Sequence, residues 1–181
     1  LFVSGKVAPH LHAPLQSGSN RVLKRMGRHW YSAGTYAAAI ERLASKLAVF
    51  GLGADIIVAF PGETAEDQAA TVALVERLPF TYLHVFTYSP RPGTAATRLA
   101  EHVPLGAAQE RSHELRHLGQ KNGKEYRARR AGSQADIVVT SVAPHEGITE
   151  DYLTVAIPGQ PRPRGARFLA RLALENEQLI A

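Results

Sequence analysis

Polar residues begin or follow the apolar runs of this sequence, and their types suit the binding of a ligand. Asp55 opens an apolar run that continues to Phe60 and stops at Pro61 and Gly62. An acid at the buried start of a strand needs a partner, because an unpaired buried carboxylate is costly. The partner is either structural, such as a backbone amide, a helix N-terminus or a basic side chain, or it is a hydroxyl or amine of a ligand.

Three further features each allow a structural and a functional interpretation. The Ser17-Gly18-Ser19 loop either caps a helix or cradles an anionic group at the helix N-terminus. Arg28, one turn beyond the expected helix, is either solvated or pairs with a carboxylate on the same side. Glu63 is either a base or an acid that the dipole of the following helix favours.

Metal-binding and nucleophilic patterns are weak in this sequence. His10 and His12 lie on one face of a short expected strand, but two histidines without a third ligand make a poor metal site. We therefore expect no metal ligand and no catalytic nucleophile, and the Ser-His-Asp, dinucleotide and Walker spacings are absent. The chain has no cysteine, which excludes disulfides and any iron–sulfur cluster held by its own thiolates.

Positive charge is concentrated in one segment. The chain has a net charge of +5, and residues 111–130 alone hold seven Lys/Arg against two Glu, a local balance of the same size. Such a basic block fits a polyanion such as nucleic acid, or it is a solvated helix face. The length of 181 residues and the apolar content of 45% suit one globular domain, or a domain with a small appendage.

Targeting and membrane signals are also weak. No apolar stretch approaches the roughly 20 residues of a membrane span, and the N-terminus lacks the pattern of a signal peptide. We therefore expect no membrane partner and a cytoplasmic location. The chain begins Leu1-Phe2-Val3 without an initiator Met, which suggests a piece of a longer chain.

Hydrophobic periodicity predicts two strand–loop–helix units followed by a third strand. The continuous apolar character of the second strand predicts that it is buried on both faces. Its alternation places Asp55 and Ile57 on one face and Ile56 and Val58 on the other. The expected strands cover residues 10–15, 54–60 and 82–88.

Capping residues set the expected helices. A short helix should cover 21–26, and Ser32 should cap a longer one whose apolar stripe reaches Phe50, with Gly51 and Gly53 as its stop. Thr64, with Asp67 as a short capping-box partner, should begin a third helix that runs to about residue 78.

Alternation of strands and helices predicts the α/β class, with a parallel sheet and right-handed crossovers. The loops after the three strands, at 16–20, 60–64 and 89–94, should share the carboxyl edge of that sheet. Three strands are too few to close a barrel, so we expect a partial, half-barrel arrangement.

The composition changes after residue 104. A polar, basic helical stretch is expected over 105–130, weakened by Gly119 and Gly123. The remainder is strand-like and suits a small β-barrel of the nucleic-acid-binding kind with three to five strands. Those strands should include 135–141, 152–157 and 166–174, with turns at 144–147 and 158–165.

In combination these motifs resemble radical S-adenosylmethionine methylthiotransferases, over essentially the whole chain. The matching segments are HLHAPLQSGS (10–19), VLKRMGR (22–28), DIIVAFPGET (55–64) and YSPRPGT (88–94). The Gln-Ser-Gly-Ser form is similar to the tRNA-modifying members. Residues 83–89 resemble the MtaB branch, which acts on N6-threonylcarbamoyladenosine, more than the MiaB branch, which acts on isopentenyladenosine. Ala59 replaces the usual Gly, a change expected to be minor because it adds one methyl on a strand.

The resemblance implies an architecture in three parts: an N-terminal methylthiotransferase domain, a partial TIM-type radical domain and a C-terminal TRAM β-barrel that binds tRNA. In this chain 1–104 would be the second half of the radical domain, 105–132 a basic helical linker and 133–181 the TRAM-like barrel. The Cys-x3-Cys-x2-Cys loop and the cysteine-bearing N-terminal domain are missing. We therefore expect that both 4Fe–4S clusters require a separate or upstream portion and that this chain alone is inactive.

The resemblance also implies a mechanism in the complete enzyme. S-adenosylmethionine is cleaved reductively to a 5′-deoxyadenosyl radical, which removes hydrogen from C2 of a modified adenosine beside the tRNA anticodon, where a methylated sulfur is inserted. For this chain it implies cofactor contacts. Gln16 and Asp55 would bond the ribose hydroxyls, Arg28 would pair with the methionyl carboxylate, and Ile57 and Ser89 would line the adenine.

Substrate and RNA contacts follow from the same resemblance. Glu63 and Arg91 would face the substrate, and basic residues would contact RNA phosphates, giving affinity rather than sequence readout. The basic residues are Lys121, Lys124, Arg127, Arg129, Arg130, Arg164 and Arg167, with Arg162 and Arg171 beside them. Two functions stay open: a portion of a tRNA methylthiotransferase, or a non-catalytic tRNA- or RNA-binding remnant.

Overall fold

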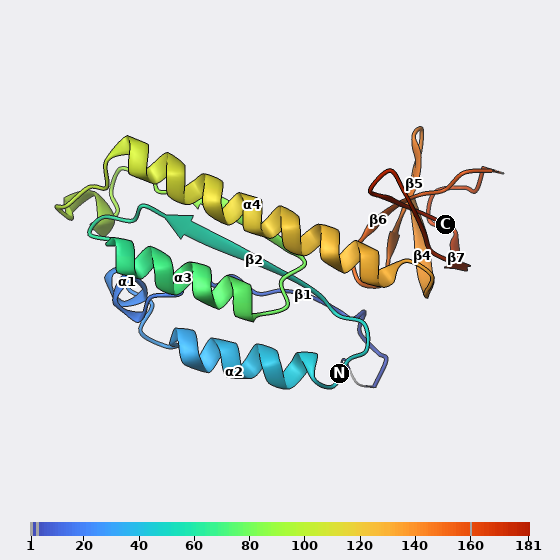
Figure 1. Ribbon diagram of the computed structural model, residues 1–181, viewed down its shortest axis with the longest axis horizontal. Coiled ribbons are helices and arrows are strands. Elements are labelled where there is room, and N and C mark those ends of the chain that lie inside the picture. The colour runs from blue at the N-terminus through green and yellow to red at the C-terminus, as the bar shows by residue number, and fades with distance from the viewer. Residues whose placement is uncertain (1, 3, 160) are drawn as a thin grey trace. The chain divides into compact units, whose positions relative to one another are not determined.

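A computed structural model describes residues 2, 4–159 and 161–181 of the chain (Figure 1). The chain divides into two compact units, which are described separately below. The mixed-sheet unit consists of Leu1–Leu11, Leu47–Gly51 and Gly123–Ala181. The parallel-sheet unit consists of His12–Lys46 and Leu52–Asn122.

A three-stranded sheet of order β1-β2-β3 forms the centre of the parallel-sheet unit. Strands β2 and β3 run parallel, and Gln16 makes a parallel bridge to Ile56. The α/β class and the partial parallel sheet are therefore confirmed. The elements are β1 (His10–His12), α1 (Asn20–Arg25), α2 (Ala33–Ala44), β2 (Gly51–Val58), α3 (Ala65–Arg77), β3 (Tyr82–Thr87) and the 3-10 helix η1 (Ala95–Arg98).

The two faces of this sheet differ in burial. Ile56 and Val85, which are paired in register, are both buried. The neighbouring register pair, Asp55 and His84, is half-buried and exposed, respectively. The predicted alternation along β2 is confirmed. Full burial on both faces is wrong, because Asp55 and Ile57 are only partly buried, although Gly51 and Gly53 on the same face are buried.

The N-terminal caps of α2 and α3 lie at the residues that the sequence predicts. Ser32 and Thr64 begin α2 and α3 with capping boxes to Thr35 and Asp67. Each box satisfies amides that a helix N-terminus would otherwise leave unpaired. Helix α3 ends at Arg77, just before the proline at position 79, as predicted.

The end of α2 differs from its prediction. The helix stops at Ala44, and Gly51 and Gly53 belong to β2 instead. A Cβ atom at Gly53 would lie 2.0 Å from the Tyr82 ring, and one at Gly51 would lie 2.1 Å from the main-chain oxygen of Asp151. Both glycines are therefore strand residues that permit a close approach, rather than helix stops.

Ala59 also differs from its prediction. Strand β2 ends at Val58, and Ala59 adopts a left-handed backbone with a φ of 59°. This conformation costs a residue with a Cβ atom roughly 1–2 kcal/mol, whereas glycine adopts it readily. The expectation that alanine is a minor change here is therefore wrong.

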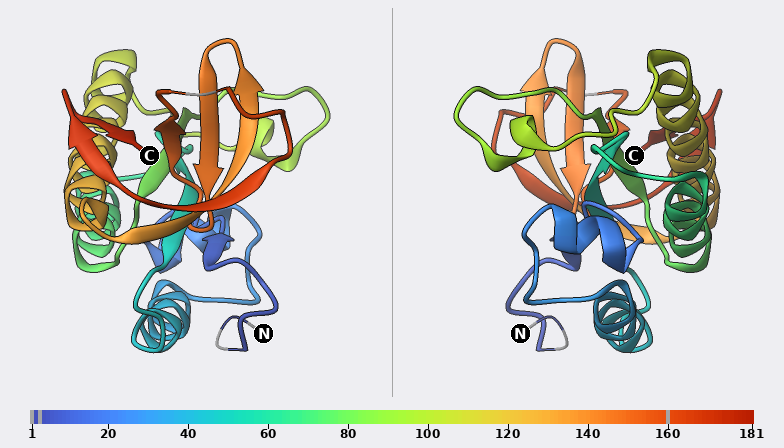
Figure 2. Two further views of the ribbon diagram at one scale, coloured as in Figure 1. Left: turned by 90° about the vertical axis from the view of Figure 1, so that its right-hand side faces the viewer. Right: turned by 90° about the vertical axis from the view of Figure 1, so that its left-hand side faces the viewer.

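The mixed-sheet unit contains a six-stranded sheet of order β7-β4-β5-β6-β9-β8. All neighbouring pairs are antiparallel except β6 and β9 (Figure 2, the β4–β5 hairpin in orange). The sheet has more strands than the three to five that were expected. The turn expected at 144–147 is confined to Ala143 and Pro144, so β5 begins at His145. The strands are β4 (Gln134–Val142), β5 (His145–Thr149), β6 (Thr154–Ala156), β7 (Arg167–Arg171), β8 (Ala173–Glu175) and β9 (Gln178–Ile180).

Its core is built by inward-facing residues of these strands and by one aromatic side chain of α4. Tyr126 packs with Ile137, Val139, Val155 and Leu179 in this core. The Tyr126 hydroxyl donates to Asp151 at 2.6 Å. Burial first, and the Asp151 carboxylate second, raise the pKa of Tyr126 far above its ordinary value.

Helix α4 (Leu105–Arg130) has 26 residues and is unbroken at Gly119 and Gly123. At Gly119 a Cβ atom would lie only 3.2 Å from the Leu83 side chain, so the small residue allows the helix to approach β3. Throughout residues 2, 4–159 and 161–181, we find no helix with the length and apolar character that a membrane crossing requires.

Candidate functional site

Polar and aromatic side chains line the face of the parallel sheet that carries Asp55. The register pairs Gly53 with Tyr82 and Asp55 with His84. Oδ1 of Asp55 lies 3.1 Å from Nε2 of His12 and 3.2 Å from Nδ1 of His84. Nδ1 of His12 lies 3.1 Å from the Tyr82 hydroxyl. In its neutral Nε2–H tautomer, His12 can accept from Tyr82 and donate to Asp55.

These contacts identify the partners of Asp55. The carboxylate has two imidazole partners, and its side chain is 28% exposed rather than fully buried. Asp55 therefore has basic side chains as structural partners, one of the alternatives that the sequence leaves open. Both imidazole contacts involve Oδ1, so Oδ2 is the oxygen that could accept from a ligand hydroxyl.

The same three residues could hold a divalent metal ion. Ligand atoms of His12, Asp55 and His84 all lie within 4.8 Å of one another. The sequence analysis found His10 and His12 without a third ligand. It missed this set because Asp55 and His84 come from the two neighbouring strands, β2 and β3. His10, by contrast, stacks on Tyr152 with ring centres 4.3 Å apart.

Gln16 joins this group at the carboxyl edge. The main-chain amide of Gln16 donates to the main-chain carbonyl oxygen of Asp55 at 2.8 Å. The main-chain carbonyl of Gln16 accepts from the main-chain amide of Ile57 at 2.9 Å. Gln16 is buried and has a φ of 69°, in the left-handed region. Backbone strain of this kind is concentrated at functional sites. Three of the five expected cofactor residues, Gln16, Asp55 and Ile57, are thus adjacent.

The segment after β3 reaches the same edge. The amide of Tyr88 donates to the carbonyl of Val58 at 2.9 Å, which places the following residue, Ser89, beside the end of β2. Arg91 lies further along, in an exposed turn where its carbonyl accepts from the Thr94 hydroxyl at 2.9 Å.

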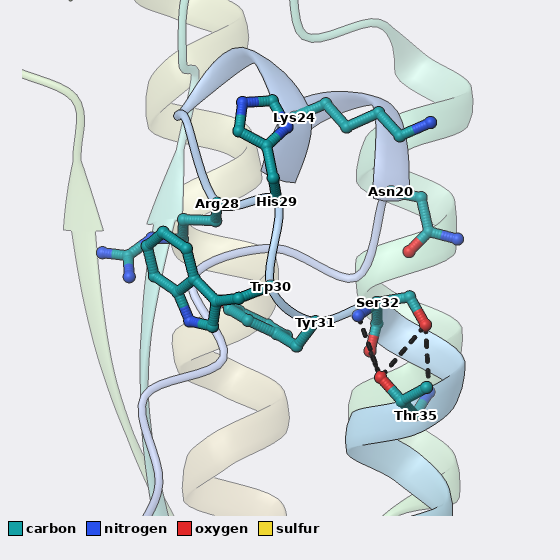
Figure 3. Close-up of a pocket in the computed structure, with 8 residues that line it drawn as sticks. All are labelled: Asn20, Lys24, Arg28, His29, Trp30, Tyr31, Ser32 and Thr35. Atoms are coloured by element: carbon teal, nitrogen blue, oxygen red, sulfur yellow. Dashed lines mark hydrogen bonds between the residues drawn. The ribbon is translucent and has the colours of Figure 1, made fainter.

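Arg28 lies apart from that group. It follows α1 and lies beside Trp30, with its guanidinium carbon 6.0 Å from the centre of the indole (Figure 3). Among the hydrogen bonds of the described residues, none joins Arg28 to Gln16 or Asp55. Arg28 instead lines a pocket formed by α1, the loop that follows it and the first turn of α2.

Glu63 is a buried residue rather than a residue of the sheet face that carries Asp55. Its side chain is 3% exposed, and Oε1 accepts from Nη1 of Arg111 at 2.7 Å and from the amide of Ala59 at 3.0 Å. Burial raises the pKa of Glu63, although the bonds from Ala59 and Arg111 oppose this effect. The partners that the structure gives this acid are therefore Arg111 and the Ala59 amide.

The Ser17-Gly18-Ser19 loop has a packing role. The Gly18 amide donates to the Thr71 hydroxyl at 2.9 Å, and the Ser19 amide donates to the Ser17 hydroxyl at 3.1 Å. A Cβ atom at Gly18 would lie 2.5 Å from the main chain at Thr71. Because these amides already have partners, the loop is a cap pressed against α3 and not an open anion cradle.

The expected RNA-binding residues fall into three groups. Arg130 is buried, with a side chain only 5% exposed, and pairs with Glu150 and Asp151 at 2.8 and 2.9 Å. This pairing leaves no guanidinium surface for a phosphate, which corrects the expected role of Arg130. Two others are exposed but already paired: Lys124 with Glu177 and Arg167 with Asp136. The remaining members are partly or fully exposed, and the ion pairs described for the chain include none of them: Lys121, Arg127, Arg129 and Arg164.

Comparison with known proteins gives three informative relatives. The MtaB threonylcarbamoyladenosine tRNA methylthiotransferase of Aquifex aeolicus is 34% identical over 154 residues, which cover 85% of this chain and 37% of that protein. The Bacillus subtilis protein of the same name is 37% identical, over 86% of this chain and 36% of that protein. A tRNA-2-methylthio-N(6)-dimethylallyladenosine synthase of Corynebacterium diphtheriae is 41% identical, over 74% and 26%. The chain is homologous to the tRNA methylthiotransferases.

This homology covers most of the chain but only a part of each relative. The chain spans about a third of the length of the curated tRNA methylthiotransferases that it matches. No protein-family model matches it.

The residues present fit one of the two cofactors that the resemblance to tRNA methylthiotransferases implies. A nucleoside such as that of S-adenosylmethionine suits the strained, buried Gln16 beside an acid with a spare oxygen and the half-exposed apolar Ile57. An iron–sulfur cluster does not fit, because none of the 181 residues is a cysteine.

Proposed function

We propose that the chain is the portion of a tRNA methylthiotransferase that holds S-adenosylmethionine and contacts tRNA. The observation that carries the proposal is the junction of Gln16, Asp55 and Ile57 at the carboxyl edge of the sheet, in a chain homologous to such enzymes. Ligands of open parallel sheets bind at this edge. Clusters of the 4Fe–4S type would need thiolates from a separate or upstream portion.

The cofactor roles divide among the edge residues. Gln16 and Oδ2 of Asp55 bond the two ribose hydroxyls, and Ile57 and Ser89 contact the adenine. Arg28, which lies apart from these edge residues, would pair with the carboxylate at the methionyl end of the cofactor, a charge-assisted contact. When bound, S-adenosylmethionine supplies the methyl group and the source of the radical. The part of this chain is to orient the nucleoside and to hold the methionyl carboxylate.

We propose N6-threonylcarbamoyladenosine in tRNA as the substrate. Relatives named for the threonylcarbamoyl and dimethylallyl substrates match at similar identity, 37% and 41%. The preference rests on the chemistry of the sheet face. A threonylcarbamoyl group carries a carboxylate and a hydroxyl, which Nε2 of His84 and the exposed guanidinium of Arg91 could bond. A dimethylallyl group offers none of these bonds.

The unpaired basic residues supply the affinity for RNA. Lys121, Arg127, Arg129 and Arg164 carry positive charge without an acidic partner among the ion pairs described. Contacts of such side chains with phosphates release counterions, which makes binding depend steeply on salt. Arg129 also lies over the Tyr126 ring at 5.4 Å, which limits the freedom of its guanidinium.

Binding of the untagged chain to a tRNA anticodon stem–loop tests the RNA role. Fluorescence anisotropy should give an affinity that falls steeply between about 50 and 200 mM salt. A Lys121→Gln, Arg127→Gln and Arg129→Gln variant should lower the slope by about 2 to 3. Lys46→Gln, which removes an exposed charge elsewhere, is the matched control. Binding that is undetectable, or that does not depend on salt, contradicts the proposed role.

A second function is favoured by the complete lack of cysteine: a non-catalytic RNA-binding remnant. Deleting the gene and analysing tRNA nucleosides by mass spectrometry separates the two. Loss of 2-methylthio-N6-threonylcarbamoyladenosine, restored by the wild-type gene and not by Asp55→Ala, supports the enzymatic function. An unchanged nucleoside profile favours the remnant.

A further inference from the structure

A pocket of about 410 Å³ lies beyond α1, apart from the Gln16–Asp55 group. Its walls come from α1, the loop that follows it and the first turn of α2 (Figure 3). The lining residues include three basic or imidazole side chains and no acid: Asn20, Lys24, Arg28, His29, Trp30, Tyr31, Ser32 and Thr35.

Trp30 is the unusual member of this pocket. Its side chain is 73% exposed, although tryptophan is normally among the most buried residue types on average. The adjacent Tyr31 anchors the loop, because its hydroxyl donates to the Leu15 carbonyl at 2.8 Å. The loop is therefore fixed in place while it presents the indole to solvent. An exposed aromatic group on a fixed segment is typical of a binding surface.

One basic side chain lies beside the indole, and two further basic or imidazole side chains lie on the other side of the loop. The guanidinium of Arg28 lies 6.0 Å from the ring centre, a cation–π distance, and Lys24 and His29 are exposed on the other side of the loop (Figure 3). The N-terminus of α2 does not contribute free amides at its cap, because Ser32 and Thr35 close a capping box there. Charge at this pocket therefore comes from side chains.

We propose that Trp30 is a stacking platform for a base of single-stranded RNA, with Lys24 and His29 contacting the flanking phosphates. Aromatic rings among basic side chains are the usual means of binding unpaired nucleotides. The inference rests on the proposed function, which supplies a single-stranded loop in the tRNA anticodon.

Trp30 is also the reporter, since it is the single tryptophan of the sequence. Titration of the untagged chain with an anticodon stem–loop RNA should quench its fluorescence, with a midpoint that matches the dissociation constant from anisotropy of labelled RNA. A blunt duplex of the same length and charge is the control ligand. It should bind without comparable quenching, because its bases are already stacked.

Variants separate stacking from charge. Trp30→Ala should weaken binding of the stem–loop by about tenfold, whereas Trp30→Phe should stay within about threefold of wild type, because it keeps an aromatic face. Lys24→Ala should lower the salt slope by about 0.7 to 0.9. Lys46→Ala, an exposed lysine beyond the opposite end of α2, should leave the slope unchanged.

The outcomes distinguish this inference from the proposed function. Stem–loop binding without quenching, together with an unaffected Trp30→Ala variant, overturns the platform and leaves the RNA role in place. Equal quenching by duplex and stem–loop overturns it as well, because an unpaired base is then not required. Failure of every RNA to bind contradicts the proposed function and the platform together. Quenching by the stem–loop with the expected order of affinities supports the platform.

Discussion

Arg111 of α4 donates to the buried carboxylate of Glu63, with Nη1 2.7 Å from Oε1 and 3.2 Å from the main-chain oxygen of the same residue. The same Oε1 accepts from the amide of Ala59. One carboxylate therefore joins the first turns of the basic helix to the left-handed residue that ends β2. Glu63 is thus a structural residue at the edge where the cofactor is proposed to bind.

The pair predicts a large loss of stability when Arg111 is removed. Arg111→Ala leaves a buried acid without its partner, and we expect the free energy of unfolding to fall by about 3–5 kcal/mol. Urea denaturation followed by circular dichroism measures the change. Lys121→Ala, an exposed residue of the same helix, should stay within about 0.5 kcal/mol of wild type. A loss below about 1 kcal/mol for Arg111→Ala would mean that the pair is not maintained in solution.

Asp67 predicts a distinct dependence on pH. Burial alone would raise the pKa of this carboxyl, but hydrogen bonds from Arg21, Ser19 and Thr64 outweigh burial and hold the pKa well below its ordinary value. A lowered folded-state pKa gives stability that is present above the unfolded pKa of about 4 and is lost as the pH falls towards the folded value.

Comparison with Asp67→Asn measures that contribution. The wild type should exceed the variant in free energy of unfolding at pH 7, and the difference should shrink between about pH 4 and 2. Urea titrations at several pH values give both numbers. A difference that is constant over this range would show that Asp67 titrates alike in the folded and unfolded chains.

Ala59 predicts a stabilising substitution. Ala59→Gly should raise the free energy of unfolding by about 1 kcal/mol, because glycine adopts a φ of 59° without the Cβ penalty. Ala69→Gly, at an exposed position inside α3, should lower it by a similar amount, because glycine is a poor helix former. The opposite signs are the test, and thermal denaturation reads both. A destabilised Ala59→Gly would indicate that the buried methyl matters more than the backbone.

Local chemistry made much of the fold predictable from sequence. Ser32 and Thr64 correctly predicted the starts of α2 and α3, because a capping side chain and its partner lie three residues apart in the chain. The prediction that Gly51 and Gly53 stop a helix is wrong. Glycine is needed at these positions because Asp151 and Tyr82 approach the backbone closely there. Sequence distance conceals a contact of that kind, and the same holds for the left-handed turn at Ala59.

The candidate site was predictable to a similar degree. Motif residues identified Asp55 and Gln16, which share the carboxyl edge. The two imidazoles that contact Asp55 come from β1 and β3. Their contact with Asp55 depends on the register of the strands, which the sequence does not reveal. Arg130 looked like its basic neighbours in the sequence, but its position at the helix end places it in the buried pairs with Glu150 and Asp151.

The Asp55 contacts give a final prediction about the cofactor. Asp55→Ala removes the acceptor proposed for a ribose hydroxyl and the partner of both imidazoles, and we expect S-adenosylmethionine to bind at least about tenfold more weakly. His84→Ala should have a smaller effect, because His12 still holds the carboxylate at 3.1 Å. Binding is measured by calorimetry or by chemical shifts of the labelled chain. Asp136→Asn, whose side chain pairs with Arg167 in the mixed-sheet unit, is the matched control. Equal affinity for folded Asp55→Ala and wild type would assign Asp55 to a structural role, since its imidazole contacts alone would then explain its position.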